Sequence, residues 1–379
     1  MSLISAIRLS RHALPAFAVQ GIYWGGFAAY VPWIKAHIEA SDSAFGLALL
    51  VAATGAVLSM LLAPLFAARL GRMAVPLAAL LLAASFQAPM WVPGVLAFAA
   101  TMFFAGAGSG LLDVVMNARL SQTEARKGAS LMNLNHAIYS FAYAASAISA
   151  GLAREAGWPP GVVFAGLAGL TLVAAIFMAE RMEPMPDRGD TPAPKGAFGG
   201  LILWGGLIVL VAFLAENATE GWSALHVERT LGGGATEGAL GPAMLGLTMG
   251  VGRFLGQLVV GRLSEVRVIF WGALITSAGA LLAAVAPVPL VAYLGFAILG
   301  LGVSIIAPML LALAGRMASD EARARVISRV TVIGYMGFFI GPPIMGFVAG
   351  ALSLRASFGM VALLLALVPG FLVLMRRAG

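Results

Sequence analysis

Long apolar runs recur along the whole chain and repeatedly reach the roughly 20 residues that an α-helix needs to cross a bilayer. Within lipid, only helices and closed β-barrels pair all of their backbone polar groups. Barrel strands would give segments of about ten residues with alternating polarity, and the sequence lacks this pattern. Because 61% of the 379 residues are hydrophobic and only 10% are charged, the chain is predicted to be an all-α membrane protein.

The apolar runs predict twelve transmembrane helices in two groups of six. One long polar, proline-rich segment separates the sixth run from the seventh. The expected division is an N-terminal six-helix bundle (1–180), a cytoplasmic linker (181–198) and a C-terminal six-helix bundle (199–379). The predicted helices lie at about residues 14–34, 44–68, 73–91, 94–118, 130–153, 158–179, 199–225, 237–261, 268–286, 288–314, 326–351 and 356–375.

A weak repeat relates the fourth predicted helix to the tenth. Residues 106–113 read GAGSGLLD, and residues 300–307 read GLGVSIIA. Small residues at this spacing permit close helix packing. The match predicts two pseudo-symmetric bundles around a central site, an arrangement that recurs in transporters. The aspartate, Asp113, occurs only in the first half.

Basic residues are distributed unevenly between the two sides of the predicted helices. Most of the 23 Lys and Arg residues fall in the tails and the even-numbered connections, whereas the opposite connections hold only Lys35, Arg154, Arg229 and Arg355. Basic connections stay in the cytoplasm, so both termini and the linker are expected there, in a bacterial inner membrane. The high isoelectric point, near 10.2, is therefore a topology signal, and no nucleic-acid partner is expected.

Asp113 lies within the long apolar run of the fourth predicted helix. A charged carboxylate at this depth costs roughly 2.5 to 3.5 kcal/mol on insertion scales, so intramembrane acids mostly face a cavity, a partner or a proton pathway. Asn117 follows one turn later and Ser109 precedes by one turn, so the three share a helix face. Asp113 is predicted to carry the coupling proton and Asn117 to contact the solute. The alternative is a structural hydrogen bond to a neighbouring helix.

The seventh predicted helix carries Glu216 and Glu220 on one face, with Trp222 nearby. Both acids are predicted to take part in proton coupling and Trp222 in solute binding. The alternative for Glu220 and Trp222 is the membrane interface, where such residues are common. Arg253 in the eighth predicted helix cannot lose its charge and therefore needs an anionic partner. An ion pair with Glu216 or Glu220 is expected, and an anionic solute is the alternative.

Two further predicted helices supply neutral polar and aromatic side chains. Amides and hydroxyls can bind a polyol, and aromatic rings can cover its apolar face. These residues are therefore predicted to line a solute site, and a histidine among them could also relay protons. The alternative is that they only join or anchor helices. They are Asn133, Asn135, His136 and Tyr139 in the fifth predicted helix, and Gln20, Tyr23 and Trp24 in the first.

Two short motifs are predicted to act in gating. Arg69 and Arg72 belong to a basic turn after the second predicted helix. Gly341, Pro342 and Pro343 interrupt the eleventh. Because proline removes a backbone donor, this sequence is expected to bend or break the helix, and such discontinuities can serve as hinges.

The twelve predicted helices, the central linker and the basic turn 69–72 resemble the major facilitator superfamily over essentially the whole chain. The loop motif of that superfamily usually contains an aspartate shortly before the turn, and Ala67 occupies that position here. Within the superfamily, residues 112–117 and 131–141 look like the fucose:proton symporter family and its bacterial relatives. The resemblance implies the major facilitator fold and import of a sugar-like solute with protons. The first predicted helix lacks the acid expected in fucose permeases, so their sugar specificity is not carried over.

Motifs for other chemistries do not occur in the sequence. There is no cysteine, no phosphate-binding loop and no His-Glu-x-x-His motif, and the histidines are scattered at 12, 37, 136 and 226. No enzyme activity, metal or cofactor is therefore expected.

The residues and the resemblance together predict a monomeric, proton-coupled secondary transporter that imports a sugar or a sugar-like solute by symport across the lipid bilayer. One alternative is a proton antiporter that exports a drug or metabolite, because the same acids could serve it. The other is a non-transporting sensor with a transporter fold, which would be expected to carry an appended soluble domain; none is predicted here.

Overall fold

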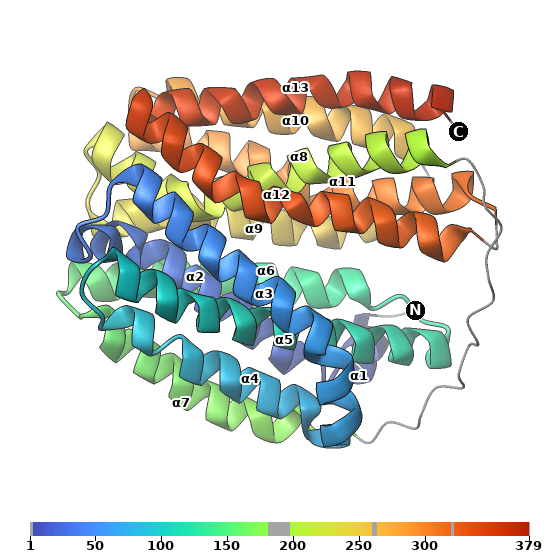
Figure 1. The fold of residues 1–379 in the computed structure, drawn as a ribbon, viewed down its shortest axis with the longest axis horizontal. Helices are drawn as coiled ribbons and strands as arrows, with labels where there is room; N and C mark the ends of the chain where they lie inside the picture. The colour runs from blue at the N-terminus through green and yellow to red at the C-terminus, as the bar shows by residue number, and fades with distance from the viewer. Residues whose placement is uncertain (1–2, 181–197, 260–263, 320–321, 379) are drawn as a thin grey trace.

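The apolar runs form long α-helices that lie side by side along one axis of the molecule in the computed structural model (Figure 1). The structure describes residues 3–180, 198–259, 264–319 and 322–378, so residues 181–197 of the predicted linker lie outside it. No β-strand occurs within these described ranges. The α-helices are α1 (Leu3–Leu9), α2 (Leu14–His37), α3 (Asp42–Leu70), α4 (Ala74–Ser85), α5 (Val95–Lys127), α6 (Met132–Glu155), α7 (Pro160–Met178), α8 (Gly199–Leu225), α9 (Ala235–Val259), α10 (Glu265–Val285), α11 (Pro289–Met317), α12 (Arg323–Ala351) and α13 (Leu354–Ala378).

Three short helical segments continue or connect these helices. They are the 3₁₀ turns η1 (Gly71–Met73) and η2 (Ala88–Met90) and the π-helical segment η3 (His226–Thr230), which extends α8. The predicted helix at 73–91 is therefore α4 followed by η2.

Helix pairings repeat between the two halves of the chain. In the half formed by α2 to α7, α2 packs on α6, α3 on α5 and α4 on α7. In the half formed by α8 to α13, α8 packs on α12, α9 on α11 and α10 on α13, which are the same pairs shifted by six helices. Gly106 of α5 lies against Ala52 of α3, and Gly300 of α11 lies against Leu245 of α9. The small-residue repeat therefore occupies equivalent contacts, and the predicted pair of pseudo-symmetric six-helix bundles is confirmed.

The two halves meet through α6 with α9, α3 with α12, and α2 with α8 and α9. By length and composition, eight segments of the described residues could cross a membrane, and one of them, Asp42–Met90, contains both α3 and α4. The long helices α2, α6 and α9 are not among the eight. All three carry polar side chains and pack against the opposite half.

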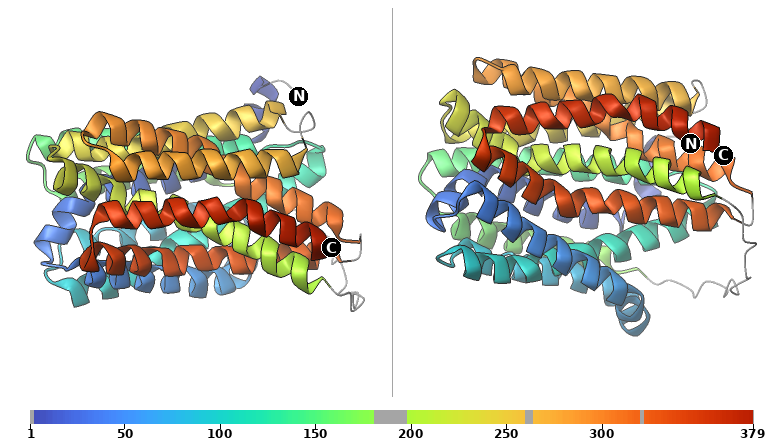
Figure 2. Two further views of the ribbon diagram at one scale, coloured as in Figure 1. Left: turned by 90° about the horizontal axis from the view of Figure 1, so that it is seen from above. Right: turned by 45° about the horizontal axis from the view of Figure 1, so that its top comes forward.

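Both chain ends lie at one end of the bundle, with α1 and the C-terminal end of α13 on the right in Figure 1. We call this the termini end. The opposite end, which we call the far end, carries the connections between α2 and α3 and between α8 and α9 (Figures 1 and 2). One side chain organises a connection at the termini end: Glu124 of α5 accepts hydrogen bonds from the backbone N–H groups of Leu131 (2.5 Å) and Met132 (2.8 Å). It thereby pairs donors that the first turn of α6 leaves free.

The eleventh predicted helix was expected to bend or break at Gly341, Pro342 and Pro343. It does not break there, because α12 continues from Arg323 to Ala351. Neighbouring packing can support a helix across prolines in a membrane protein. Here α3 lies against this part of α12, with Gly46 next to the carbonyl oxygen of Pro342.

Candidate functional site

A cavity of about 290 Å³ lies between the two halves. Its walls come from α2, α3, α5 and α6 on one side and from α8, α9 and α12 on the other. This volume is near the lower limit for ligand pockets, which suits a small solute. Nine residues singled out from the sequence line the cavity: Gln20, Trp24, Asp113, His136, Tyr139, Glu216, Glu220, Arg253 and Pro342.

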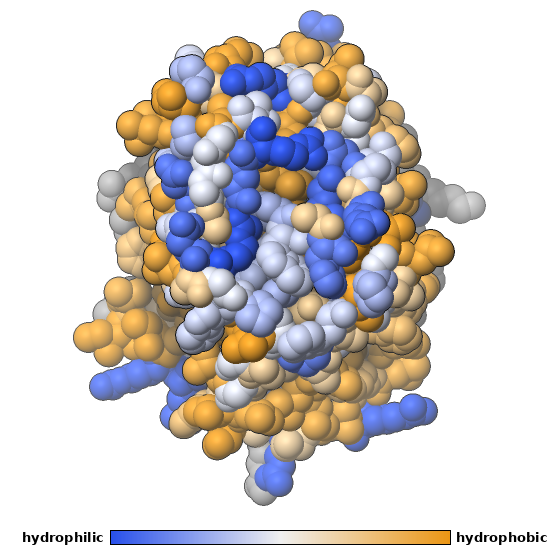
Figure 3. All heavy atoms as spheres, turned by 90° about the vertical axis from the view of Figure 1, so that its left-hand side faces the viewer, coloured by the Kyte–Doolittle hydropathy of each residue, from blue (hydrophilic) through white to orange (hydrophobic). Residues whose placement is uncertain are grey.

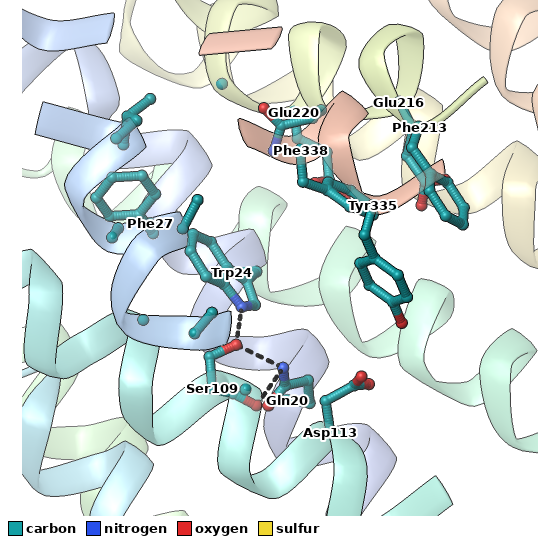
Figure 4. Close-up of a pocket in the computed structure, with 18 of the residues that line it drawn as sticks. Gln20, Trp24, Phe27, Ser109, Asp113, Phe213, Glu216, Glu220, Tyr335 and Phe338 are labelled. Atoms are coloured by element: carbon teal, nitrogen blue, oxygen red, sulfur yellow. Dashed lines mark hydrogen bonds between the residues drawn. The ribbon is translucent and has the colours of Figure 1, made fainter. Parts of the chain in front are cut away.

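Ser109 joins α2 to α5 in the wall of the cavity (Figure 4). Its hydroxyl oxygen accepts hydrogen bonds from Gln20 Nε2 (2.7 Å) and from Trp24 Nε1 (2.9 Å). Gln20 is buried, and its Oε1 has no hydrogen-bond partner among the described residues. The N–H groups of Gln20 and Trp24 therefore already donate hydrogen bonds, whereas the side-chain oxygen of Gln20 can still accept one.

Asp113 is the first member of a hydrogen-bonded chain along α5 and α6. Asn117 Nδ2 donates to Asp113 Oδ1 (3.0 Å), and Asn117 Oδ1 lies 3.2 Å from His136 Nε2. Because the amide donates through its nitrogen, its oxygen is the acceptor for the histidine. The imidazole therefore carries a hydrogen on Nε2. Asn117 lies behind the cavity wall and orients two residues that line it.

Arg253 of α9 connects this chain to the other half of the protein. Its Nη1 donates to Ser140 Oγ (2.7 Å) and to the backbone oxygen of His136 (3.4 Å), and its Nη2 donates to Glu216 Oε1 (3.2 Å). Both side chains of the ion pair are largely buried, with 15% and 11% exposed. The ion pair expected from the sequence is therefore present, and Ser140 is a partner that the sequence did not predict.

Glu220 lines the same cavity one helical turn beyond Glu216. It forms no hydrogen bond or ion pair with any described residue. Among the described residues that line the cavity, the charged groups are thus three carboxyl groups, on Asp113, Glu216 and Glu220, and one guanidinium group, on Arg253. That guanidinium is already paired with Glu216.

Aromatic side chains of α8 and α12 form a wall that sequence reasoning missed. The ring of Phe213 lies 4.7 Å from that of Phe338 and 5.6 Å from that of Tyr335, and all three line the cavity. Tyr335 and Phe338 are three residues apart, so they share one helix face with Pro342. This spacing could have identified the aromatic residues from the sequence. They were missed because their helix contains no intramembrane acid that would mark it as part of the site. Figure 4 shows these rings on the same wall as Glu216 and Glu220.

Three predicted solute contacts lie away from the cavity. Tyr23 is fully buried against the rings of Phe86 and Phe164. Asn135 is fully buried and donates to Ser10 Oγ (2.9 Å), which ties α6 to the chain before α2. Trp222 is fully buried with the edge of its ring system against Phe45. All three pack between helices, because only one side of each helix faces the cavity.

The remaining predicted site residues also lie outside the cavity wall. Asn133 is half-buried on α6. Arg69 and Arg72 are exposed at the termini end, where Arg119 donates to the backbone oxygen of Gly71 (2.7 Å) and holds their turn against α5. Gly341 and Pro343 are buried in α12 on either side of Pro342.

Ion pairs join the two halves at the far end. Asp42 accepts hydrogen bonds of 2.6 and 2.7 Å from Arg229, and it also lies 2.9 Å from Lys35 Nζ. Arg154 at the end of α6 pairs with Glu228 of η3. We call these five residues the far-end latch. Figure 3 shows this face, where hydrophilic residues gather at the centre and apolar residues surround them.

Two pseudo-symmetric helical bundles around a cavity with charged residues in its wall, and with ion pairs between the bundles, are the arrangement of a membrane transporter. The family model of the Major Facilitator Superfamily matches residues 13–265 and 205–378, and the chain belongs to this superfamily. It is 31% identical over 355 residues to an uncharacterised MFS-type transporter of Yersinia pestis, covering 92% of this chain and 91% of that protein. The family contains transporters and not enzymes, as the sequence predicted.

Solved structures share the fold of the chain. A D-xylose-proton symporter aligns with a TM-score of 0.76 at 17% identity over 98% of both chains. The nucleoside transporter NupG also aligns with a TM-score of 0.76, at 11% identity over 97% of this chain and 99% of that one. The superfamily predicted from the sequence is thus confirmed, whereas the closer resemblance to fucose:proton symporters stays a prediction.

Proposed function

We propose that this protein is a proton-coupled secondary transporter that moves a small polar solute through the central cavity by alternating access. The observation that carries the proposal is the chain of contacts from Asp113 through Asn117 and His136 to Arg253 and Glu216. It runs from an acid in one half to an ion pair in the other, so a change at either end can affect the other.

Asp113 is the proton-binding group in this proposal. An acid in a cavity within the membrane can alternate between the neutral and charged forms as the cavity opens to one side and then the other. The Asn117 amide holds its carboxyl group in place, and His136 positions both that amide and the guanidinium of Arg253. Glu216 and Glu220 are secondary acids of the same pathway.

The ion pair between Glu216 and Arg253 is the switchable element. Arg253 contacts Ser140 and the His136 backbone in the opposite half, so separation of the halves on this side removes those contacts. The guanidinium then keeps Glu216 as its partner. The protein can shift between two conformations, with the cavity open to one side or to the other, only when a ligand binds one of them more tightly. In this proposal the proton and the cargo together supply that preference.

The orientation follows from the distribution of basic residues. With the termini end in the cytoplasm of a bacterial inner membrane, the far-end latch closes the outer side of the cavity. We propose import of a sugar-like solute, with Gln20, Trp24 and Tyr139 as neutral contacts in the cavity. The same acids would also serve an exporter that exchanges its cargo for protons.

The test uses purified protein in proteoliposomes with a pH-sensitive dye inside. A thermal-shift screen of sugars, organic acids and amines first selects a cargo, because a ligand that binds the folded state stabilises it. We expect Asp113→Asn to abolish proton-driven accumulation of that cargo while exchange of labelled for unlabelled cargo continues. Accumulation against a gradient by Asp113→Asn would refute the proposal. The sign of the internal pH change on adding cargo distinguishes symport from antiport.

A further inference from the structure

Among the described residues, the cavity wall contains more acidic groups than basic groups. Asp113, Glu216 and Glu220 supply three carboxyl groups, and Arg253 supplies one guanidinium. Glu216 has that guanidinium as its partner at 3.2 Å, and Asp113 has the Asn117 amide at 3.0 Å. Glu220 has neither a hydrogen bond nor an ion pair with any described residue. A carboxylate removed from water is unfavourable without a counter-charge or a proton. If Asp113 takes the transported proton, then Glu220 is the carboxyl group that still has no directly bonded partner, since Arg253 acts on it only from beyond ion-pair distance.

Neutral groups beside these acids also lack partners. Gln20 is 6% exposed, and its Oε1 can only accept a hydrogen bond. The hydroxyl of Tyr143, on a side chain 1% exposed, has no partner among the described residues either. Both residues line the cavity. An unsatisfied buried polar group is unfavourable, so a ligand that forms a hydrogen bond to it gains affinity.

Aromatic rings complete this environment. Phe213 lies seven residues before Glu220, two turns away on the same face of α8. Its ring contacts those of Tyr335 and Phe338 from α12. The faces of such rings attract cations, and the attraction is stronger when water is excluded. An unpaired carboxyl group and a ring cluster on one wall therefore favour a cation over a neutral or an anionic group.

We infer that the cargo carries a protonated amino group, with Glu220 as its counter-ion and the Phe213, Tyr335 and Phe338 rings around it. The inference rests on the proposed function, since it names the chemical class of the solute in the same cavity. The cavity of about 290 Å³ limits this cargo to a small amine. The remaining polar groups of the wall suit hydroxyl groups, so an amino sugar or another small hydroxylated amine fits best. Arg253 does not recruit an anion, because Glu216 and Ser140 occupy its guanidinium.

The test compares amines with neutral compounds of matched shape. The probes are D-glucosamine against D-glucose and ethanolamine against ethylene glycol, with dissociation constants measured on the purified wild-type protein. We expect the amine of at least one pair to bind about tenfold or more tightly than its neutral partner, because only the amine supplies a counter-charge for the buried carboxylate. In Glu220→Gln, which keeps the shape and removes the charge, the two should bind equally. Glu39→Gln removes an exposed far-end acid, and the preference should persist in that control.

Equal binding within every pair, or no binding of any amine, would overturn the inference. So would a preference for the amine that survives in Glu220→Gln. A different result would refute the proposed function, namely proton-driven accumulation that persists in Asp113→Asn. If the protein accumulates a neutral cargo with protons, the proposed function is supported and the inference that the cargo is an amine is wrong.

Discussion

Arg253 contacts both halves of the protein with one side chain. Its guanidinium donates to Ser140 and the His136 backbone on α6 and to Glu216 on α8. A guanidinium cannot neutralise itself by losing a proton, so its burial requires these acceptors. Removal of the arginine would leave the Glu216 carboxyl group without a counter-charge.

We predict that Arg253→Gln destabilises the protein by about 2–5 kcal/mol, because one charge of a largely buried pair stays behind. The double variant Arg253→Gln with Glu216→Gln should recover much of this loss, since an uncharged pair leaves no unpaired charge. Thermal unfolding in detergent measures both, with Glu216→Gln alone completing the cycle. Additive effects of the two single substitutions would show that the ion pair contributes no coupling.

The sequence predicted which helices contribute charged and amide groups near the cavity better than it predicted which side of a helix each residue occupies. Asp113, Asn117, Glu216 and Arg253 were found because charge and amide groups are conspicuous in apolar runs, and helical spacing grouped them correctly. Trp222 lies two residues after Glu220 and points elsewhere, into a contact with Phe45. Helical spacing shows which residues share a face of one helix. It does not show which face lies against a neighbouring helix and which face lines the cavity, because that depends on how the helices pack.

At the scale of helices, glycines set how closely α3 and α5 approach. A Cβ atom at Gly106 would lie 1.9 Å from the backbone oxygen of Ala52, far closer than atoms can pack. The contact is with backbone, so relief requires the helices to move apart. The sequence indicated close packing from the spacing of small residues, but it could not name α3 as the partner. Likewise, it predicted an effect of Pro342 and Pro343 on α12 without showing that the helix continues.

We predict that Gly106→Ala destabilises the protein by about 1–3 kcal/mol, the usual effect of overpacking. Gly169→Ala is the matched control, because nothing lies within 4 Å of a Cβ atom at that position of α7. There the substitution should be neutral or stabilising by up to about 1 kcal/mol, since alanine favours the helix. Apparent melting temperatures of the two variants give the comparison. Equal changes would contradict the close contact between α3 and α5.

At the scale of the whole molecule, the four basic residues that depart from the charge bias all have structural partners. Lys35 and Arg229 pair with Asp42, and Arg154 pairs with Glu228. Arg355 donates to the backbone oxygen of Ala284 (3.1 Å). From the sequence, these residues could be recognised only as exceptions to the uneven distribution of basic residues. Their acidic or backbone partners could not be predicted, because most of them are distant along the chain. Three of the four belong to the far-end latch, so the exceptions mark the place where the halves are held together.

Alternating access requires the far-end latch to open once in each cycle. Ser43 and Gly350 lie on opposite halves beside it, and a Cβ atom at Gly350 would lie 3.2 Å from Ser43 Oγ. The chain contains no cysteine, so Ser43→Cys with Gly350→Cys introduces a single pair within reach of a disulfide. We predict that oxidation of this double variant stops cargo accumulation in proteoliposomes and that reduction restores it. Each single variant, treated with the same oxidant, should transport normally. Full transport by the cross-linked protein would mean that the far end stays closed throughout the cycle, which an alternating-access mechanism does not allow.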